Sequence, residues 1–372
     1  MEKIETENII KNDYINKPKN SLWKIIVPVL SILFIASGIF FYLKFTQKNN
    51  VISTKKDILI GFSITTLQEE RWQKDKAEFL KKAEELGVVV DFQEAQNNSD
   101  KQISQIESMI IKGVDVIVVV PYDSNALAPV INKAHKAGIK IISYDRMINN
   151  ADIDAYISFD NKKIGEDEVN YVIDSLKDKM VKGVKLKIAY VGGSDTDNNA
   201  ISLRKSSFDI LQPLINSGKI EIVFDKFTTN WNPDIAYKNM KNYLINNSNK
   251  IDAVIAANDG TAFGSITALS EFGLAGKIPV SGQDAELAAC QRIISGTQTL
   301  TIYKSINKLA STAVETAIAF ANGEKVNTNY IINNGKIDVP SILLEPVAVT
   351  KDNMYDIIIK DGYHSYEDVY KK

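Results

Sequence analysis

The sequence contains one cysteine, two histidines and four arginines among its 372 residues. The single cysteine, Cys290, excludes an intrachain disulfide and a thiolate metal cluster. His135 and His364 lie far apart and have no ligand-spaced neighbours, so we expect no metal site, no cofactor and no histidine-based catalytic site. The net charge is only −2, and the interspersed charges form no basic stripe, which argues against nucleic-acid binding.

One long apolar run, residues 25–43, contains no charged side chain. As a helix it would span about 29 Å, against a bilayer hydrocarbon core of about 30 Å. Trp23 and Tyr42 near its ends match an interfacial aromatic belt. We therefore predict a transmembrane helix over residues 25–43. A cleaved signal peptide is the alternative, but its apolar region is usually shorter and ends at a small-residue cleavage site.

Lysines flank this run on both sides, so the charge distribution hardly decides its orientation. We expect residues 1–24 to form a short cytoplasmic tail and residues 44–56 a linker. The remainder would lie on the extracytoplasmic face of the cell membrane, which makes the chain a single-pass membrane protein. This orientation rests mainly on the ligand argument that follows.

From Asp57 onward, short Val/Ile-rich runs alternate with amphipathic stretches, as in "DILIGFSI" followed by helical periodicity to Leu86. About ten such units follow one another. Buried strands separated by helices predict parallel sheets that are covered on both faces. We predict an α/β fold with two doubly wound parallel-sheet lobes.

Polar and aromatic residues follow many of these strands, where ligands of open α/β sheets bind. Carboxylates, amides and guanidinium groups suit the hydroxyls of a sugar, and an indole suits the C–H face of its ring. The candidate sugar-binding residues are Arg71, Trp72, Asp145, Arg146, Asp197, Asn199, Trp231, Asn258, Asp284 and Lys304.

Several of these residues have a second interpretation. Trp72 shares a helical face with Phe79 and Ala83, so its spacing fits a core residue as well as a ligand platform. Asp197, Asn258 and Asp284 follow strands, where aspartate and asparagine often cap the next helix. Only the whole set, which includes two of the four arginines, favours a ligand site.

Several segments stand in an order that resembles the type I periplasmic sugar-binding proteins, especially those that bind D-xylose. They include "ERWQKD", "GVDVIVVVPY", "SYDRMINNADIDAYISFDN", "GGSDTDNNA", "SGQDAELA" and "SGTQTLTIYK". The resemblance covers about residues 58–363. It implies that the ten candidates contact xylose, with Trp72 and Trp231 on the two faces of the pyranose.

The resemblance also implies a domain organisation. The N-terminal lobe would comprise residues 57–160 and 304–335, and the C-terminal lobe residues 161–303 and 336–372. Three crossovers would lie near Phe159, Tyr303 and Gly335, and sugar binding would close the lobes by a hinge motion.

The apolar run and the sugar residues together predict a membrane-anchored xylose receptor that signals to a sensor histidine kinase and regulates xylose uptake genes. The alternative is the substrate-binding component of an ABC-type xylose importer, which would use the same ligand residues and a permease partner. We expect no enzyme, because no raised-pKa acid stands opposite a second carboxylate as in a glycosidase. A sugar-responsive repressor is disfavoured, because the apolar run occupies the place of a helix-turn-helix.

Overall fold

The computed structural model describes residues 23–49 and 57–370, which belong to two separate units, residues 1–56 and 57–372. The first unit contains α1 (Trp23–Asn49), which has Pro28 inside it. A membrane span requires about 20 consecutive, predominantly apolar helical residues. No helix in the described part of the chain is long and apolar enough for this, so the predicted transmembrane helix over residues 25–43 is not supported. Residues 1–22 of the predicted tail and residues 50–56 of the predicted linker lie outside the described residues.

The second unit begins with a lobe built on a seven-stranded sheet of order β10-β11-β5-β4-β3-β1-β2. Its strands pair in parallel, except for the antiparallel edge pair β10–β11. The strands are β1 (Leu59–Ile64), β2 (Val89–Glu94), β3 (Val116–Val119), β4 (Lys140–Tyr144), β5 (Ala155–Phe159), β10 (Tyr330–Asn333) and β11 (Asp338–Leu344).

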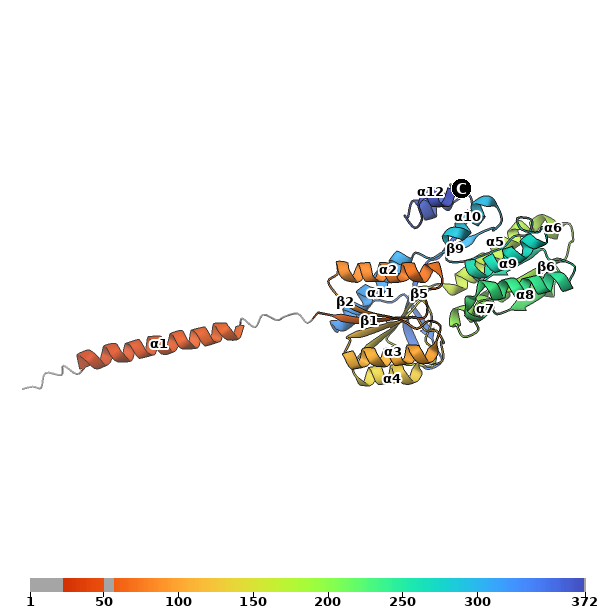
Figure 1. The fold of residues 1–372 in the computed structure, drawn as a ribbon. Helices are drawn as coiled ribbons and strands as arrows, with labels where there is room; N and C mark the ends of the chain where they lie inside the picture. The colour runs from red at the N-terminus through yellow and green to blue at the C-terminus, as the bar shows by residue number, and fades with distance from the viewer. Residues whose placement is uncertain (1–22, 50–56, 371–372) are drawn as a thin grey trace, which may run out of the picture. The chain divides into compact units, whose positions relative to one another are not determined.

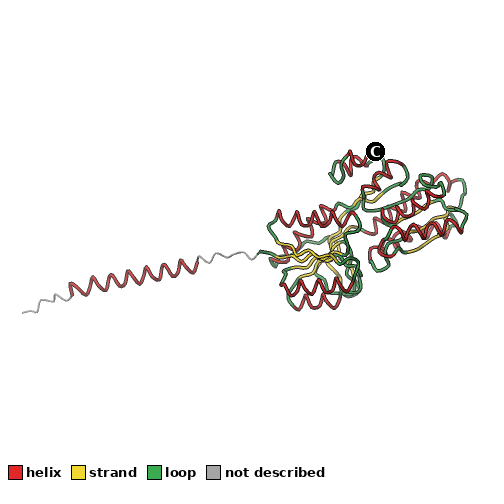
Figure 2. The backbone as a smooth tube through the Cα atoms, viewed as in Figure 1, coloured by secondary structure: helices red, strands yellow, loops and turns green. Residues whose placement is uncertain are grey.

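Helices cover both faces of this sheet (Figures 1 and 2). They are α2 (Glu70–Glu85), α3 (Ser99–Lys112), α4 (Ala128–Lys136) and α11 (Ile306–Ala321). Successive side chains of a strand point to opposite faces. Val116 and Val118 of β3 accordingly join the cluster that contains Phe79 of α2, whereas Ile117 and Val119 join the cluster beneath α3 and α4.

The second lobe has a three-stranded parallel sheet of order β7-β6-β8. Ile188 and Tyr190 of β6 pack with α5 and α7, while Ala189 and Val191 pack with α8 and α9. The elements are α5 (Asn161–Ser175), α6 (Lys177–Val181), β6 (Leu186–Val191), α7 (Asn198–Asn216), β7 (Ile220–Lys226), η1 (Thr229–Trp231), α8 (Pro233–Asn246), β8 (Ala253–Ala256), α9 (Asp259–Glu271) and α10 (Leu287–Ser295).

A small antiparallel pair, β9 (Thr301–Tyr303) and β12 (Val347–Val349), lies where the chain passes between the lobes. It is followed by η2 (Tyr355–Ile359) and α12 (Tyr366–Tyr370), which pack with α10 in a cluster that contains Cys290. The α/β prediction with parallel sheets is confirmed for the second unit.

The third crossover differs from the expected position near Gly335. β11 pairs in parallel with β5, so residues 338–344 belong to the first sheet. The chain leaves that sheet between Leu344 and Val347. The expected boundary is therefore about ten residues too early, because the pairing of β11 with β5 places β11 in the first lobe.

Candidate functional site

One cavity between the lobes brings all ten predicted residues together. It is lined by Arg71, Trp72, Asp145, Arg146, Asp197, Asn199, Trp231, Asn258, Asp284 and Lys304, and also by Glu69 and Gln283. The volume of this cavity is only about 20 Å³, far below the range of about 300–1,000 Å³ for ligand pockets, so its side chains fill most of the space between them. Parallel strands end at this edge, so residues distant in sequence meet in one place.

Arg71 is the centre of the ion pairs in this cavity. Its guanidinium lies 2.9 Å from Asp145 Oδ2 and 3.3 Å from Asp284 Oδ1, so it joins the two lobes. On its other side, Nε lies 3.2 Å from Asp75 Oδ2, and the Tyr144 hydroxyl donates to Asp75. Asp75 and Tyr144 do not line the cavity, but Asp75 fixes the guanidinium group of Arg71 and Tyr144 fixes Asp75. The i,i+4 spacing of Arg71 and Asp75 was the signal for this pair.

Two more cations complete the ion pairs. Arg146 Nε lies 2.7 Å from Asp197 Oδ2, and Lys304 Nζ lies 2.9 Å from Asp284 Oδ1. Three cations thus face three aspartates and Glu69, whose pKa is raised by burial. A site with balanced internal charge suits a neutral polar ligand better than an anion or a cation.

The pKa values of two of these aspartates are shifted in opposite directions. Burial opposes ionisation of Asp145, but Arg71, Lys304 and Arg146 outweigh it and lower the pKa of this carboxyl below its usual value. Burial raises the pKa of Asp197, and the opposing Arg146 only partly offsets this. Asp145 is therefore the more firmly ionised of the two acceptors.

In the second lobe, two candidate residues cap helices and also line the cavity. The Asp197 side chain accepts from the Asn199 backbone N–H at 2.9 Å and caps α7. Asn258 caps α9 in a reciprocal capping box with Thr261. Both residues also line the cavity, so each cap orients its side chain at the site. Asp284 is not the residue that caps α10; that position is Glu286.

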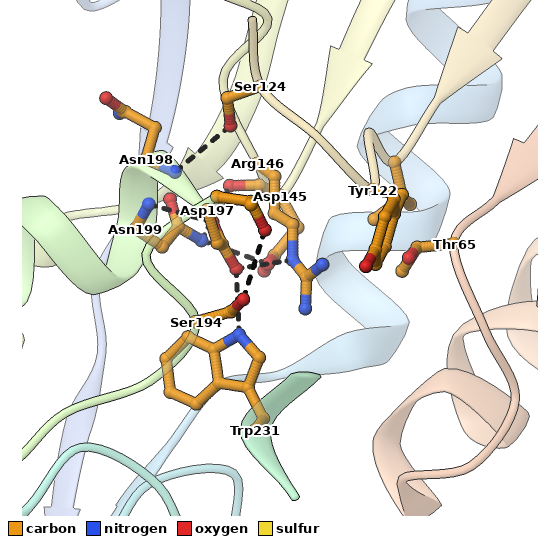
Figure 3. Close-up of polar contacts among 12 residues, drawn as sticks. Thr65, Tyr122, Ser124, Asp145, Arg146, Ser194, Asp197, Asn198, Asn199 and Trp231 are labelled. Carbon is orange, nitrogen blue, oxygen red and sulfur yellow. Dashed lines mark hydrogen bonds and ion pairs between the residues drawn. The ribbon is translucent and has the colours of Figure 1, made fainter. Parts of the chain in front are cut away.

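Trp231 is held by a glycine and by a hydrogen bond. Its indole Nε1 donates to Asp197 Oδ2 at 3.1 Å, as Figure 3 shows. A Cβ placed on Gly193 would lie 2.2 Å from the indole ring, so only glycine leaves room for it. Trp231, Asp145 and Asp284 all have positive φ, of 56°, 59° and 96°. Such backbone strain in non-glycine residues clusters at functional sites.

Trp72 is a core residue and also lines the cavity. It belongs to the main buried cluster and is only 2% exposed. It also lines the cavity, and the Arg71 guanidinium lies 4.0 Å from its ring centroid. A cation over an indole face is a stabilising contact, so Trp72 and Arg71 position each other.

Two acceptor oxygens of the cavity residues, Glu69 Oε2 and Gln283 Oε1, are buried and accept no hydrogen bond from the described residues. Buried acceptors are normally satisfied, so these two favour a ligand that donates hydrogen bonds. Sequence reasoning missed Glu69 and Gln283. Both lie next to predicted features: Glu69 directly precedes the segment "ERWQKD", and Gln283 directly precedes the candidate Asp284.

The two lobes are also joined by hydrogen bonds between residues outside the cavity, of which Figure 3 shows the Asn198–Ser124 bond. The Ser124 N–H donates to Thr196 O, and the Asn198 N–H donates to Ser124 Oγ, both at 3.0 Å. The Tyr122 hydroxyl donates to Asn230 Oδ1 at 3.0 Å. These bonds and the Arg71–Asp284 ion pair hold the two lobes together.

The sequence pattern of the periplasmic binding protein domain matches residues 60–325 of this chain. The chain belongs to the periplasmic binding protein family. Proteins of this family are binding components, so this periplasmic binding protein is not an enzyme.

Relatives and solved structures agree with this family. The D-xylose-binding periplasmic protein of Escherichia coli (strain K12) is 48% identical over 315 residues, 85% of this chain and 93% of the relative. The protein of the same name from Haemophilus influenzae is also 48% identical, with the same coverage. An ABC transporter solute-binding protein from Clostridium phytofermentans with bound β-D-glucose is 29% identical, with a TM-score of 0.77, and the match covers 84% of this chain and 99% of that one.

These findings correct the predicted location. The two relatives at 48% identity are named periplasmic proteins, and no helix in the described ranges is long and apolar enough to cross a membrane. The prediction of a single-pass protein of the cell membrane is therefore wrong.

Proposed function

We propose that this periplasmic binding protein binds D-xylose in the cavity between its lobes and delivers it to an ABC-type importer. The observation that carries the proposal is the cavity itself. Two indoles, several ion pairs and two buried acceptor oxygens that accept no hydrogen bond from the described residues line one small space between the lobes. This combination suits a small neutral polyol, whose hydroxyls donate to the acceptors and whose ring packs on the indoles.

The relatives support the choice of sugar and of role. Two relatives at 48% identity carry the name D-xylose-binding periplasmic protein. The C. phytofermentans structure is that of an ABC transporter solute-binding protein. The importer role, which was the alternative in the sequence analysis, is thus better supported than signalling to a histidine kinase. The signalling hypothesis depended on the membrane helix, which is not supported.

Binding would close the lobes, because the proposed ligand residues come from both. Arg71, Asp145 and Arg146 lie in the first lobe, and Asp197, Trp231 and Asn258 lie in the second. A ligand that contacts both sides stabilises the closed arrangement over an open one.

Calorimetric titration of the full chain with D-xylose, D-ribose, D-glucose and L-arabinose tests the sugar. We expect one-to-one binding with D-xylose tightest. Trp231→Ala and Arg146→Ala should each weaken xylose binding by about 2 kcal/mol or more, which is at least about thirtyfold. Absence of binding by every pentose, in a chain with an intact cooperative unfolding transition, would refute the proposal.

Deletion of the gene in the cell that makes this protein tests the transport role. We expect uptake of labelled D-xylose at low concentration to be lost, and to return with the wild-type gene but not with the Arg146→Ala gene. Intact uptake combined with lost xylose-dependent transcription would favour signalling instead.

A further inference from the structure

An open groove adjoins the sugar cavity on the side where α2, α8, α9 and α10 begin. We name it the outer groove. It is lined by Gln68 and Gln73 of the first lobe and by Asn232, Phe263, Ala288 and Arg292 of the second, among others. The volume of the groove is about 380 Å³. Pockets of about 300–1,000 Å³ hold small ligands, so the outer groove has room for a further sugar ring.

Two residues connect the outer groove to the sugar cavity. Glu69 and Trp231 line both spaces. Glu69 precedes α2, but its side chain makes no capping hydrogen bond, and its buried Oε2 has no partner among the described residues. A polar oxygen at the junction of two adjoining spaces is placed to accept a hydrogen bond from a ligand that extends through both.

The chemistry of the outer groove is that of a carbohydrate subsite. Phe263 of α9 is half exposed, with 50% of its surface accessible. It lines the groove together with the amide and carboxylate side chains of residues such as Gln73, Asn232 and Glu70. An aromatic ring packs on the apolar face of a sugar, while amides and carboxylates bond its hydroxyls. The Arg292 guanidinium lies 5.4 Å from the Phe263 ring centroid and donates to Asp259 O, which fixes one side of the groove.

The groups around the outer groove also favour a neutral ligand. Arg292 is the arginine of its lining, and Glu69, Glu70 and Glu286 are its carboxylates. Glu70 Oε2 already accepts from the Leu287 N–H at 3.0 Å. Burial, followed by the nearby Asp259 and Asp284, raises the pKa of Glu286 to about 8, and burial also raises the pKa of Glu69. The groove therefore presents hydrogen-bonding groups without a strong excess of either charge.

We propose that the outer groove is a second sugar subsite, so that the protein also binds a xylose disaccharide with one ring in the sugar cavity and the other beside Phe263. This inference rests on the proposed binding of xylose in the cavity. The shared residues Glu69 and Trp231 would lie at the junction between the two rings.

Titration of the full chain with D-xylose and with 1,4-β-xylobiose tests the second subsite. We expect both sugars to bind one-to-one to the wild-type protein. Phe263→Ala should weaken xylobiose about five- to tenfold through loss of one aromatic contact, while xylose affinity stays within about twofold. Ala288→Trp places a large side chain in the groove at an exposed position and should remove xylobiose binding while xylose still binds. Tyr330→Ala, an exposed aromatic residue of the sheet edge, is the matched control and should change neither affinity.

The outcomes separate the two proposals. If xylose binds but xylobiose does not, the second subsite is refuted and the proposed function stands. If xylobiose binds with equal affinity to wild type, Phe263→Ala and Ala288→Trp, its second ring lies elsewhere and the subsite is again refuted. If neither sugar binds, the proposed function fails, and the second subsite fails with it.

Discussion

The two lobes hold their halves of the cavity in different ways. In the first lobe, Arg71 is supported by a buried side-chain network behind it, with Asp75 and Tyr144. In the second lobe, Asp197 and Asn258 are held by the helices that they cap, and Trp231 is held against Gly193. The first arrangement couples the site to the stability of the core. The second fixes each residue locally, so damage there should affect the ligand more than the fold.

The largest effect should follow from Asp75→Asn in the first lobe. Asp75 is fully buried, and its loss leaves a buried guanidinium without one of its partners. Breaking a buried ion pair costs about 3–5 kcal/mol, so we expect a loss of this size in the free energy of unfolding, measured in urea. Xylose affinity should fall as well, because Arg71 loses its support.

Asp225→Asn is the matched control for this prediction. Asp225 pairs with Arg204 on the surface, where the two side chains are 28% and 35% exposed. Exposed pairs contribute about 0–1 kcal/mol. Equal losses of stability in the two variants would show that the network behind Arg71 has no special structural role.

The second lobe should respond differently to Gly193→Ala. The added Cβ would meet the Trp231 indole at 2.2 Å, so the ring must move out of its place in the cavity. We expect xylose affinity to fall by about 2 kcal/mol, as for loss of a central aromatic contact, measured by calorimetry. At Gly192, an added Cβ would come no closer than 3.2 Å to its neighbours, so Gly192→Ala should have the smaller effect. The reverse order would contradict the proposed position of Trp231.

Asn258 allows the cap and the ligand contact to be separated. Asn258→Ala removes the cap of α9 and should cost about 1 kcal/mol of stability together with affinity. Asn258→Asp keeps a capping acceptor but lacks the amide donor. We expect the aspartate variant to unfold like the wild type and to bind xylose more weakly. If its affinity were unchanged, the amide would have no role in binding.

The pH dependence of stability depends on a buried carboxyl of the second lobe. Glu168 is buried and neither of its oxygens has a hydrogen-bond partner among the described residues. Burial, and then Asp259 and Asp284, raise the pKa of Glu168 well above its usual value. Its contribution to stability is therefore fully present below the unfolded-state pKa of about 4.3 and is lost as the pH rises through the folded-state pKa.

Glu168→Gln should remove this dependence. We expect the variant to lose less unfolding free energy than the wild type between about pH 5 and pH 8, measured in urea at each pH. Glu166→Gln, on a partly exposed face of the same helix, is the control and should follow the wild-type curve. Parallel curves for Glu168→Gln and the wild type would mean that Glu168 titrates normally.

Much of the site could be predicted from the sequence. Buried parallel strands appear in the sequence as continuous Val/Ile runs, and their carboxyl ends lie at the same edge of the sheet. This is why residues as distant as Arg71 and Lys304 could be assigned to one site from the sequence pattern. Asp75 could not be assigned in this way, because it lies inside helix α2 and its role depends on Tyr144 of β4.

By itself, the sequence determined the parallel α/β architecture and the ten residues that line one cavity, because hydrophobic periodicity and strand ends are local signals. Only the tertiary structure decided that β11 pairs with β5, that Tyr144 of β4 holds Asp75 beside Arg71, and that Glu69 connects the cavity to the outer groove. Each of these depends on groups that are distant in the chain or on the direction of a side chain. Local periodicity carries no information about which distant segments become neighbours.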